Sequence, residues 1–375
     1  MKIGILTLPI AENYGGILQA VALYRFLSSQ GHDVVLIYKQ KKQVFWKRLI
    51  IALIVKIPFQ DFRGLKSNYK NNKERLKRKA FHRGFIEKEI SEMSKDLHTR
   101  QDLEEFAREQ KLDVVIVGSD QVWRKKYIDE KYYKNYFLDF VDGSRTKKIA
   151  YAASFGKDHW EGENDHAEIA KLLQDFTAVS MREASGVLTC KEAFGYEKAV
   201  HVLDPTMLMS KDFYQEEIIK KHNVTGVGKG GLLTYVLDEA EEKKEIIEFT
   251  KNIYKFENVL HLKGFDTLHV TYSAPQWLAA FAGADFVVTD SFHGMVFSII
   301  FEKEFVVIGN ESRGLDRFIS LLDALGLKER LVFNVKNFEG GELGKINYNK
   351  VNEILGMQKK KSLEFLMRAL NNGRR

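Results

Sequence analysis

The stretch KIGILTLPIAENYGGILQAVALYRFLSSQGHDVVLIY, residues 2–38, decides the fold. Its first apolar run predicts a strand, a glycine-containing turn follows, and the next run places apolar residues on one broad helical face. The final run, GHDVVLIY, predicts a second strand. A strand, a helix and a strand in this order form a βαβ unit, which implies a parallel sheet.

Eight further apolar runs continue this alternation along the chain. Each is rich in Val, Ile or Ala, as parallel strands that are covered on both faces usually are. The runs are LDVVIVGSD, KIAYAASFG, AVSMRE and AVHVLDPT, and then GLLTYVLD, NVLHLKG, ADFVVTDSFHG and EFVVIGN. The 375 residues also exceed the roughly 250–300 at which a single core usually splits. We therefore predict one α/β domain over residues 1–210, a second over 225–345, and a helix at 346–375 that packs across both.

The positive charge of the chain is concentrated in one segment. The net charge is +7, but residues 39–83 carry 15 Lys/Arg against two acids, so the remainder of the chain is mildly acidic. Three interpretations of this segment stay open: an amphipathic element on an anionic membrane, a nucleic-acid contact, and a solvated insertion on the first domain. No recognisable RNA or DNA module accompanies the charge, so we expect no nucleic-acid partner.

The remaining composition favours a cytoplasmic enzyme that uses no metal and no cofactor. Cys190 is the single cysteine, which excludes an internal disulfide framework. The first residues lack the apolar region and cleavage site of a signal peptide, and the longest apolar stretch, residues 49–59, is too short to span a bilayer. The ten histidines form no HxxxH pair and there is no CxxC pair, so no metal site is expected.

The stretch TDSFHGMVFSII, residues 289–300, places a histidine where an apolar strand passes into an apolar helix. Such a junction aims backbone N–H groups and the positive end of the helix dipole at one point, which suits an anion. His293 is therefore the first candidate for chemistry. The alternative is a buried, hydrogen-bonded histidine in a capped helix.

Further polar residues follow the predicted strands. Ligands of open parallel sheets bind beyond the carboxyl ends of the strands, so we expect a site in the cleft between the two domains. The candidates are Asn13, Tyr14, Gly15, Gln19, Ser119, Asp120, Trp123, Arg182, Lys263, Ser291, His293, Gly294, Arg313 and Arg317.

Taken together, VGSDQVW, ASFG, VSMREASG, VLDPTML and TDSFHGMVFSIIFEKEFVV, followed by RGLDRFISLLDALGL, resemble the polysaccharide pyruvyl transferase family. The resemblance covers roughly residues 3–330 and leaves out most of the basic segment. It implies two Rossmann-like domains that face each other across a cleft, as in GT-B glycosyltransferases. It also implies transfer of a pyruvyl unit from phosphoenolpyruvate to a sugar of a bacterial capsule or exopolysaccharide, or of its lipid-linked precursor, commonly as a ketal. The basic segment would then contact an anionic membrane at the inner face of the cell membrane.

The resemblance assigns donor chemistry to the second domain and to one arginine of the first. His293 matches the motif histidine, which acts as a general acid or contacts phosphate. Arg182 matches an arginine that could grip phosphate or carboxylate, with a salt bridge to Glu183 or another acid as the alternative.

One departure from the family pattern removes a positive charge. Many members carry an arginine two residues before the motif histidine, where this chain has Ser291. Lys263, Arg313 and Arg317 are the candidates to replace it, and Gly294 would allow close approach of a ligand or serve packing.

The acceptor side falls to the first domain. The turn residues Asn13, Tyr14, Gly15 and Gln19 are candidates to meet the sugar, with helix capping as the alternative. In GSDQVW, Ser119 and Trp123 are candidates to contact the sugar, and Asp120 is the candidate base. Helix capping again competes for Ser119 and Asp120.

Two other acids are expected to be structural, namely Asp204 before a proline and Asp290 as a helix cap, with a role as a base as the alternative for Asp290. Two other functions stay open for the whole chain. One is a GT-B glycosyltransferase that uses a nucleotide sugar, because the fold would be shared. The other is a non-catalytic protein of glycan assembly that has lost its chemistry along with the arginine.

Overall fold

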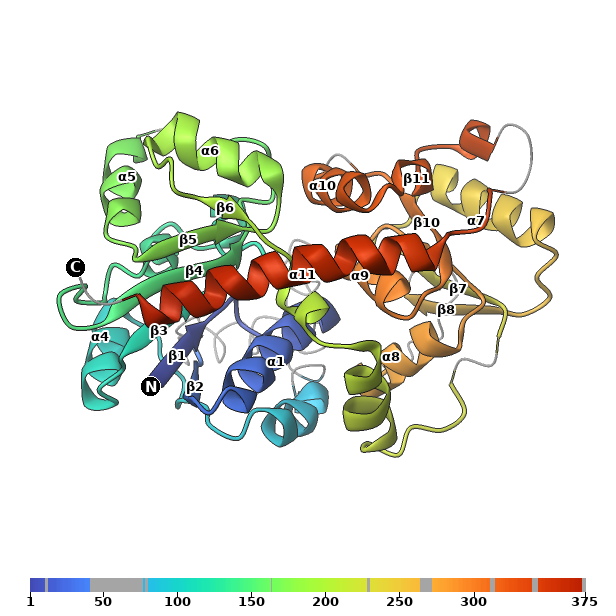
Figure 1. Ribbon diagram of the computed structural model, residues 1–375. Coiled ribbons are helices and arrows are strands. Elements are labelled where there is room, and N and C mark those ends of the chain that lie inside the picture. The colour runs from blue at the N-terminus through green and yellow to red at the C-terminus, as the bar shows by residue number, and fades with distance from the viewer. Residues whose placement is uncertain are drawn as a thin grey trace, which may run out of the picture.

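Two parallel sheets bridged by one long helix form the framework of the protein (Figure 1). The computed structural model describes residues 1–10, 13–40, 77, 80–162, 164–227, 230–263, 272–310, 314–338 and 343–372. Most of the basic segment of residues 39–83 therefore lies outside the described residues, and so does Arg313.

The first sheet has six strands in the order β2-β1-β3-β4-β5-β6, and every pair is parallel. Its strands are β1 (Lys2–Leu6), β2 (Asp33–Ile37), β3 (Val114–Val117), β4 (Lys147–Ala153), β5 (Ala178–Met181) and β6 (Val200–His201). Its helices are α1 (Tyr14–Ser29), α4 (Arg100–Glu109), α5 (His166–Gln174) and α6 (Ala184–Phe194). The strand interiors are buried because helices or loops cover both faces, which explains their continuous apolar runs.

The second sheet has five parallel strands in the order β11-β10-β9-β7-β8. Its strands are β7 (Leu232–Tyr235), β8 (Val259–Lys263), β9 (Phe286–Thr289), β10 (Glu304–Ile308) and β11 (Leu331–Val332). Its helices are α7 (Glu241–Ile253), α8 (Ala274–Gly283), α9 (Phe292–Ile300) and α10 (Asp316–Leu325). The two-residue strand β11 was missed from the sequence because LV is too short to give a periodic signal.

Both sheets share one topology. In each, the second strand in chain order lies at one edge, the first comes next, and the later strands follow on the other side. The strand order therefore reverses between β1 and β3 in the first sheet and between β7 and β9 in the second. Such switch points open a crevice at the carboxyl ends of the strands, which is where ligands of this class of sheet bind.

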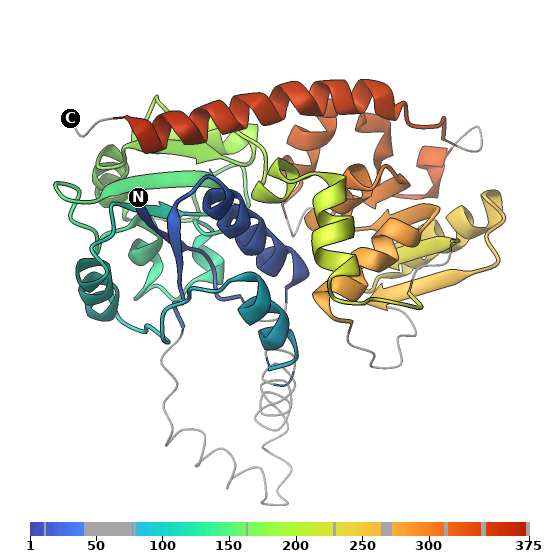
Figure 2. The ribbon, with the colours of Figure 1, turned by 60° about the horizontal axis from the view of Figure 1, so that its bottom comes forward.

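The last helix, α11 (Tyr348–Asn371), runs along both lobes (Figures 1 and 2). At its start, the Tyr348 hydroxyl donates to the Lys303 carbonyl of the second lobe. Further along, the Ser362 hydroxyl accepts the Leu203 N–H, and near its end the Lys147 ammonium donates to the Leu370 carbonyl at 2.6 Å. The helix thus binds the two lobes to each other.

The lobes also share one apolar core. A single cluster of buried side chains extends from α1 of the first lobe through α8 and α9 of the second lobe to α11. At its centre, the Tyr14 ring stacks on the Trp277 ring with centroids 5.3 Å apart, and the Tyr14 hydroxyl donates to the Tyr272 carbonyl at 2.7 Å. Because this contact joins α1 to α8, it sets the carboxyl ends of the two sheets against each other.

Among the described residues, we find no helix that combines the length and apolar character needed to cross a bilayer.

Candidate active site

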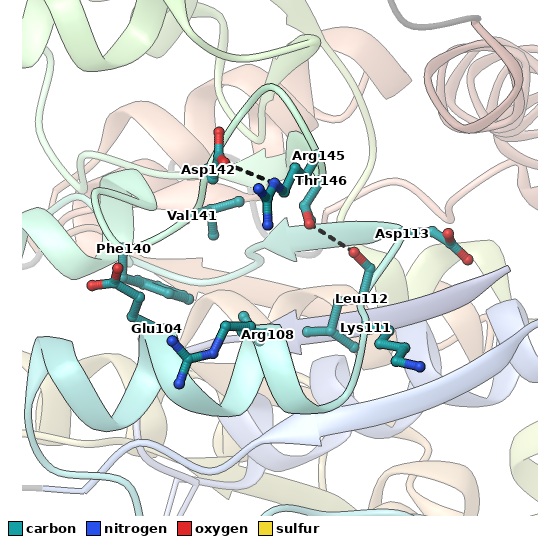
Figure 3. Close-up of a pocket in the computed structure, with 11 residues that line it drawn as sticks. Glu104, Arg108, Lys111, Leu112, Asp113, Phe140, Val141, Asp142, Arg145 and Thr146 are labelled. Carbon is teal, nitrogen blue, oxygen red and sulfur yellow. Dashed lines mark hydrogen bonds and ion pairs between the residues drawn. The ribbon is translucent and has the colours of Figure 1, made fainter.

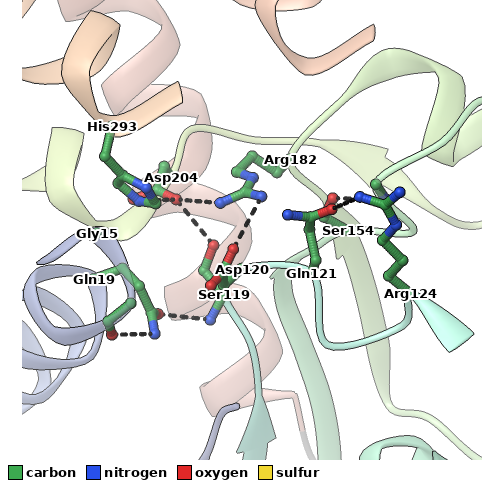
Figure 4. A network of polar contacts seen from close by, with 12 residues as sticks. Gly15, Gln19, Ser119, Asp120, Gln121, Arg124, Ser154, Arg182, Asp204 and His293 are labelled. Carbon is green, nitrogen blue, oxygen red and sulfur yellow. Dashed lines mark hydrogen bonds and ion pairs between the residues drawn. The ribbon is translucent and has the colours of Figure 1, made fainter. Parts of the chain in front are cut away.

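The site is built on a polar anchor at the β1/β3 switch point. The Gln19 side chain, fully buried on α1, donates to the Thr7 hydroxyl and the Gly16 carbonyl, both at 2.9 Å. Its carbonyl oxygen accepts the Ser119 N–H at 2.9 Å (Figure 4). Because every polar atom of this amide is used, Gln19 fixes the loop after β3 rather than presenting itself to a sugar.

Asp204 lies at the centre of the network in Figure 4 and is fully buried. Its Oδ2 accepts from Arg182 Nη1 at 3.0 Å, lies 3.1 Å from the Ser119 hydroxyl, and faces His293 Nε2 at 3.6 Å. Its Oδ1 accepts the hydroxyl and N–H of Thr206 at 2.7 and 3.0 Å. The carboxylate therefore joins the first lobe to the motif histidine of the second.

The surroundings of Asp204 keep it ionised. Burial alone would raise the pKa of this carboxyl. The nearby charges of His293 and Arg182 and the hydrogen bond from the Thr206 N–H outweigh burial, so the pKa lies well below its usual range. An acid with such a pKa cannot give up a proton at neutral pH, so its part in the site is to hold and orient cations.

His293 is held between the two lobes. It lies in the first turn of α9 and is 5% exposed. Its Nε2 faces Asp204, and its other nitrogen lies against Gly15 at the start of α1 (Figure 4). A Cβ atom at position 15 would stand 2.0 Å from His293 Nδ1, so glycine is required for this approach.

Two arginines from different lobes lie over one aromatic ring. The Arg182 guanidinium lies 4.5 Å from the Phe292 ring centroid, and the Arg317 guanidinium lies 5.6 Å from it. Both side chains are almost wholly buried. Burial lowers the pKa of Arg317 to about 10, and the neighbouring charge of Arg182 acts in the same direction. Of the three candidates for the missing cation, Arg317 is thus brought to the site, while the Lys263 side chain and Arg313 lie outside the described residues.

Asp120 completes the charged cluster. Its Oδ1 lies 3.5 Å from Arg182 Nη2, so Arg182 pairs with Asp204 and Asp120 rather than with its neighbour Glu183. Asp120 adopts φ +70°, a left-handed conformation that aspartate tolerates better than most residues do. Neither Asp120 nor Ser119 begins a helix, so the capping alternative for both is wrong.

Glu183 shapes the loop beside the cluster. Its Oε1 accepts the Phe155 N–H at 3.1 Å, and burial raises the pKa of this carboxyl. The same loop reaches the second lobe at Gly156, because a Cβ atom on Gly314 would stand 2.0 Å from the Gly156 carbonyl oxygen. The two lobes therefore meet at this loop as well as at His293.

Three predicted residues around α9 have structural contacts. Ser291 is the N-cap and its hydroxyl accepts the Gly294 N–H at 3.4 Å, so the capping prediction for Asp290 is wrong. Asp290 instead pairs with Lys243 Nζ at 2.6 Å and accepts the Leu237 N–H at 2.7 Å. A Cβ atom at Gly294 would lie 2.3 Å from the Thr289 hydroxyl, which supports the packing role of this glycine.

The predicted aromatic contacts with a sugar need correction. Trp123 is 1% exposed, stacks on Phe137 at 4.9 Å and donates its indole N–H to the Tyr136 carbonyl. Tyr14 is buried between the lobes, as described above. Asn13 caps α1 by accepting the Gly15 N–H at 3.1 Å. The motif GSDQVW does not show whether its tryptophan is buried or exposed. The sequence therefore could not tell a core residue from a residue that contacts a sugar.

Asp204 has a larger part in the site than the sequence predicts. The sequence predicts a structural role for this aspartate of the DPT motif, and it does accept the Thr206 N–H as a local cap would. Its second oxygen, however, makes the contacts with Ser119, Arg182 and His293. The signal that could have identified it is a second acid in a predicted cluster of cations, because buried charges need partners.

Among the described residues, no group of three or more His, Cys, Asp or Glu side chains is arranged to hold a metal ion. A separate hollow of about 460 Å³ lies at the amino ends of β3 and β4 (Figure 3). It is lined by residues such as Arg108, Asp113 and Arg145. This is the edge of the sheet opposite to the charged cluster, so the hollow does not belong to the candidate site.

The fold and the cluster define a two-lobed α/β enzyme whose charged site lies where the carboxyl ends of both sheets meet. A family model, polysaccharide pyruvyl transferase, matches residues 13–312. The chain therefore belongs to the polysaccharide pyruvyl transferase family and is a pyruvyltransferase. None of the curated proteins compared with the chain matches it.

Solved structures share the fold at low sequence identity. A glycosyltransferase from Rickettsia africae is 10% identical, with a TM-score of 0.54 over 99% of this chain and 99% of that chain. A UDP-N-acetylglucosamine 2-epimerase from Rickettsia bellii is 11% identical, with a TM-score of 0.50 over 98% of this chain and 96% of that chain. These similarities confirm the GT-B-like arrangement of two parallel-sheet domains.

The close approach of Gly15 to His293 predicts unequal effects of two neighbouring substitutions. Gly15→Ala should displace the imidazole and lower the free energy of unfolding despite the better helix propensity of alanine. Gly16→Ala is the matched control, because the atoms nearest to its Cβ would be those of the Asn13 side chain, from 3.6 Å, which is an ordinary contact. Gly16→Ala should leave stability unchanged or raise it by up to about 1 kcal/mol. Urea unfolding of both variants measures the difference, and equal stabilities would contradict the geometry.

The depressed pKa of Asp204 predicts a pH-dependent cost for Asp204→Asn. A carboxyl whose pKa is lower in the folded state stabilises the protein above its unfolded pKa of about 4, and this stabilisation is lost as the pH falls further. Removing the charge from this buried cluster should cost about 3–5 kcal/mol at pH 7. The difference between wild type and variant should narrow below about pH 4. Urea unfolding of both proteins from pH 7 to below pH 4 measures this difference in the free energy of unfolding. A difference that stays constant with pH would contradict the ionised state of Asp204.

Proposed function

We propose that the protein transfers the pyruvyl unit of phosphoenolpyruvate to two hydroxyls of a glycan sugar, forming a ketal and releasing phosphate. The observation that carries the proposal is the cluster of His293, Arg182 and Arg317, which brings three cationic or cation-forming side chains together at the junction of the lobes. Membership of the family supports pyruvyl transfer. The positive charge of the cluster supports a small anionic donor.

The donor would bind through charge. Phosphoenolpyruvate carries a phosphate and a carboxylate close together. A planar guanidinium group can form bidentate hydrogen bonds with either of them. Arg182 comes from the loop after β5 and Arg317 from the first turn of α10, so each lobe contributes one guanidinium. Many family members have an arginine at the position of Ser291. In this proposal Arg317 supplies that positive charge instead.

Proton transfer would fall to His293 and Asp120. Histidine is suited to donating and accepting protons near neutral pH. Asp204 stays ionised, so it would orient the imidazole and not act as the acid. Asp120, at the carboxyl end of β3, would take a proton from the sugar hydroxyl.

The chemistry balances without a cofactor. The methylene carbon of phosphoenolpyruvate gains a proton and becomes a methyl group. The central carbon forms two C–O bonds to sugar oxygens, and its C–O bond to phosphate breaks. Of the two hydroxyl protons released, one balances the proton gained by the methylene carbon and the other leaves with phosphate.

The proposal extends to the acceptor and its place in the cell. A lipid-linked or polymeric glycan would bind on the side of the first lobe. The basic excess of residues 39–83 would hold the enzyme at the anionic cytoplasmic face of the membrane that carries such an acceptor. The similarity to a glycosyltransferase concerns the fold only. Transfer of a sugar from a nucleotide sugar is therefore kept as the alternative that the experiment tests.

Isothermal titration of phosphoenolpyruvate tests the donor site. Wild type should bind, and His293→Ala, Arg182→Ala and Arg317→Ala should each weaken binding by about tenfold or more, because a hydrogen bond to a charged group contributes about 1.5–3 kcal/mol. His166→Ala and Arg100→Ala replace exposed residues of α5 and α4 and should bind as wild type does.

Thermal melting of every variant separates lost binding from lost folding, and Arg182→Lys keeps the buried charge if Arg182→Ala does not fold. Wild type that binds UDP-galactose and ignores phosphoenolpyruvate would favour glycosyl transfer. Wild type that binds neither would favour a non-catalytic role in glycan assembly.

A further inference from the structure

We infer that Tyr127 forms the platform on which a sugar ring of the acceptor stacks. The inference rests on the proposed function, because it assigns the acceptor side of the same site. It also replaces Trp123, the aromatic residue that the sequence favoured and that the structure places in the core.

The Tyr127 side chain packs against a buried arginine. Arg124 is 3% exposed, and its Nη1 donates to the Gln121 side-chain oxygen and to the Tyr127 hydroxyl, both at 2.9 Å. The Arg124 guanidinium also lies 4.3 Å from the Tyr127 ring centroid. A cation over the ring together with a hydrogen bond to its hydroxyl holds the phenol in one orientation.

The support is fixed at the seam between the lobes. A Cβ atom on Gly156 would lie 2.2 Å from the Gln121 side-chain oxygen and 2.8 Å from Arg124 Cδ. The Gly156 carbonyl in turn touches Gly314 of the second lobe. Arg124 and Gln121 therefore lie beside the charged cluster, as Figure 4 shows.

Tyr127 is one of the exposed residues of the protein. It is 46% exposed, although the Arg124 guanidinium lies over its ring. Tyrosine has an apolar ring and a polar hydroxyl, which matches a pyranose with its apolar C–H face and its rim of hydroxyls. The Tyr127 hydroxyl accepts from Arg124 and keeps its own proton to donate.

The position relative to the donor fits an acceptor subsite. Tyr127 contacts Arg124, which lies in the polar network of Figure 4 together with Arg182 and Asp120. A sugar on this platform would therefore lie on the same side of the molecule as the charged cluster. Among the described residues, the exposed aromatic side chains are Phe81, Tyr127 and Phe333. Tyr127 has an arginine guanidinium over its ring.

The test measures glycoside binding and donor binding in the same proteins. Wild type, Tyr127→Ala and Tyr127→Trp are titrated with a panel of p-nitrophenyl glycosides, namely glucoside, galactoside, mannoside and N-acetylglucosaminide, with and without phosphoenolpyruvate. Wild type should bind at least one glycoside, and Tyr127→Ala should weaken it about three- to tenfold, the loss expected for one aromatic stacking contact. Tyr127→Trp should retain binding.

The matched control is Tyr132→Ala, which removes a tyrosine of the same segment whose ring contacts Lys39 and Lys131 and not the site. It should bind the glycoside as wild type does. Phosphoenolpyruvate should bind all four proteins equally, and its failure to bind wild type would overturn the donor site itself. If phosphoenolpyruvate binds and no glycoside in the panel shows binding that depends on Tyr127, the role of Tyr127 is contradicted while the proposed donor site stands.

Discussion

The burial of the Asp204 carboxylate is the constraint on which the rest of the site depends. An ionised acid without solvent is stable only when cations and hydrogen-bond donors surround it. Here those groups come from separate parts of the chain, namely Thr206 beside it, Arg182 after β5 and His293 from the second lobe. The compensation of one charge thus requires the two lobes to meet in one arrangement.

Packing makes that arrangement specific. The Tyr14 ring on Trp277 sets α1 against α8, and α11 binds both lobes along their length. At the point of closest approach, Gly15 leaves room for the His293 ring. The apolar contacts supply the free energy that holds the lobes together, and the polar contacts determine which atoms face one another. The result is a set of charges placed before any ligand arrives, which is what electrostatic catalysis requires.

The sequence predicted the framework well because parallel strands leave a clear signal. The long apolar runs that became β3, β4, β7 and β9 were identified, as was the placement of polar residues at their carboxyl ends. His293, Arg182 and Asp120 were brought together as candidates by motif order. What the sequence could not give is the direction of a side chain: Trp123 and Tyr127 lie four residues apart, and only packing decides that the first is buried and the second exposed. Asp204 was undervalued for the same reason, since its second oxygen faces partners far along the chain.

The central claim is that an anionic donor binds to the cluster that Asp204 organises. The most direct measurement is the nuclear magnetic resonance spectrum of protein with ¹⁵N-labelled histidine during titration with phosphoenolpyruvate. The His293 signals are assigned by their loss in His293→Gln. The account predicts that the ligand shifts the His293 imidazole signals in wild type and that the shift is lost in Arg182→Lys, which cannot grip the donor at two points. A ligand that leaves the His293 signals unchanged, or that shifts only histidines outside the cluster, would contradict the account.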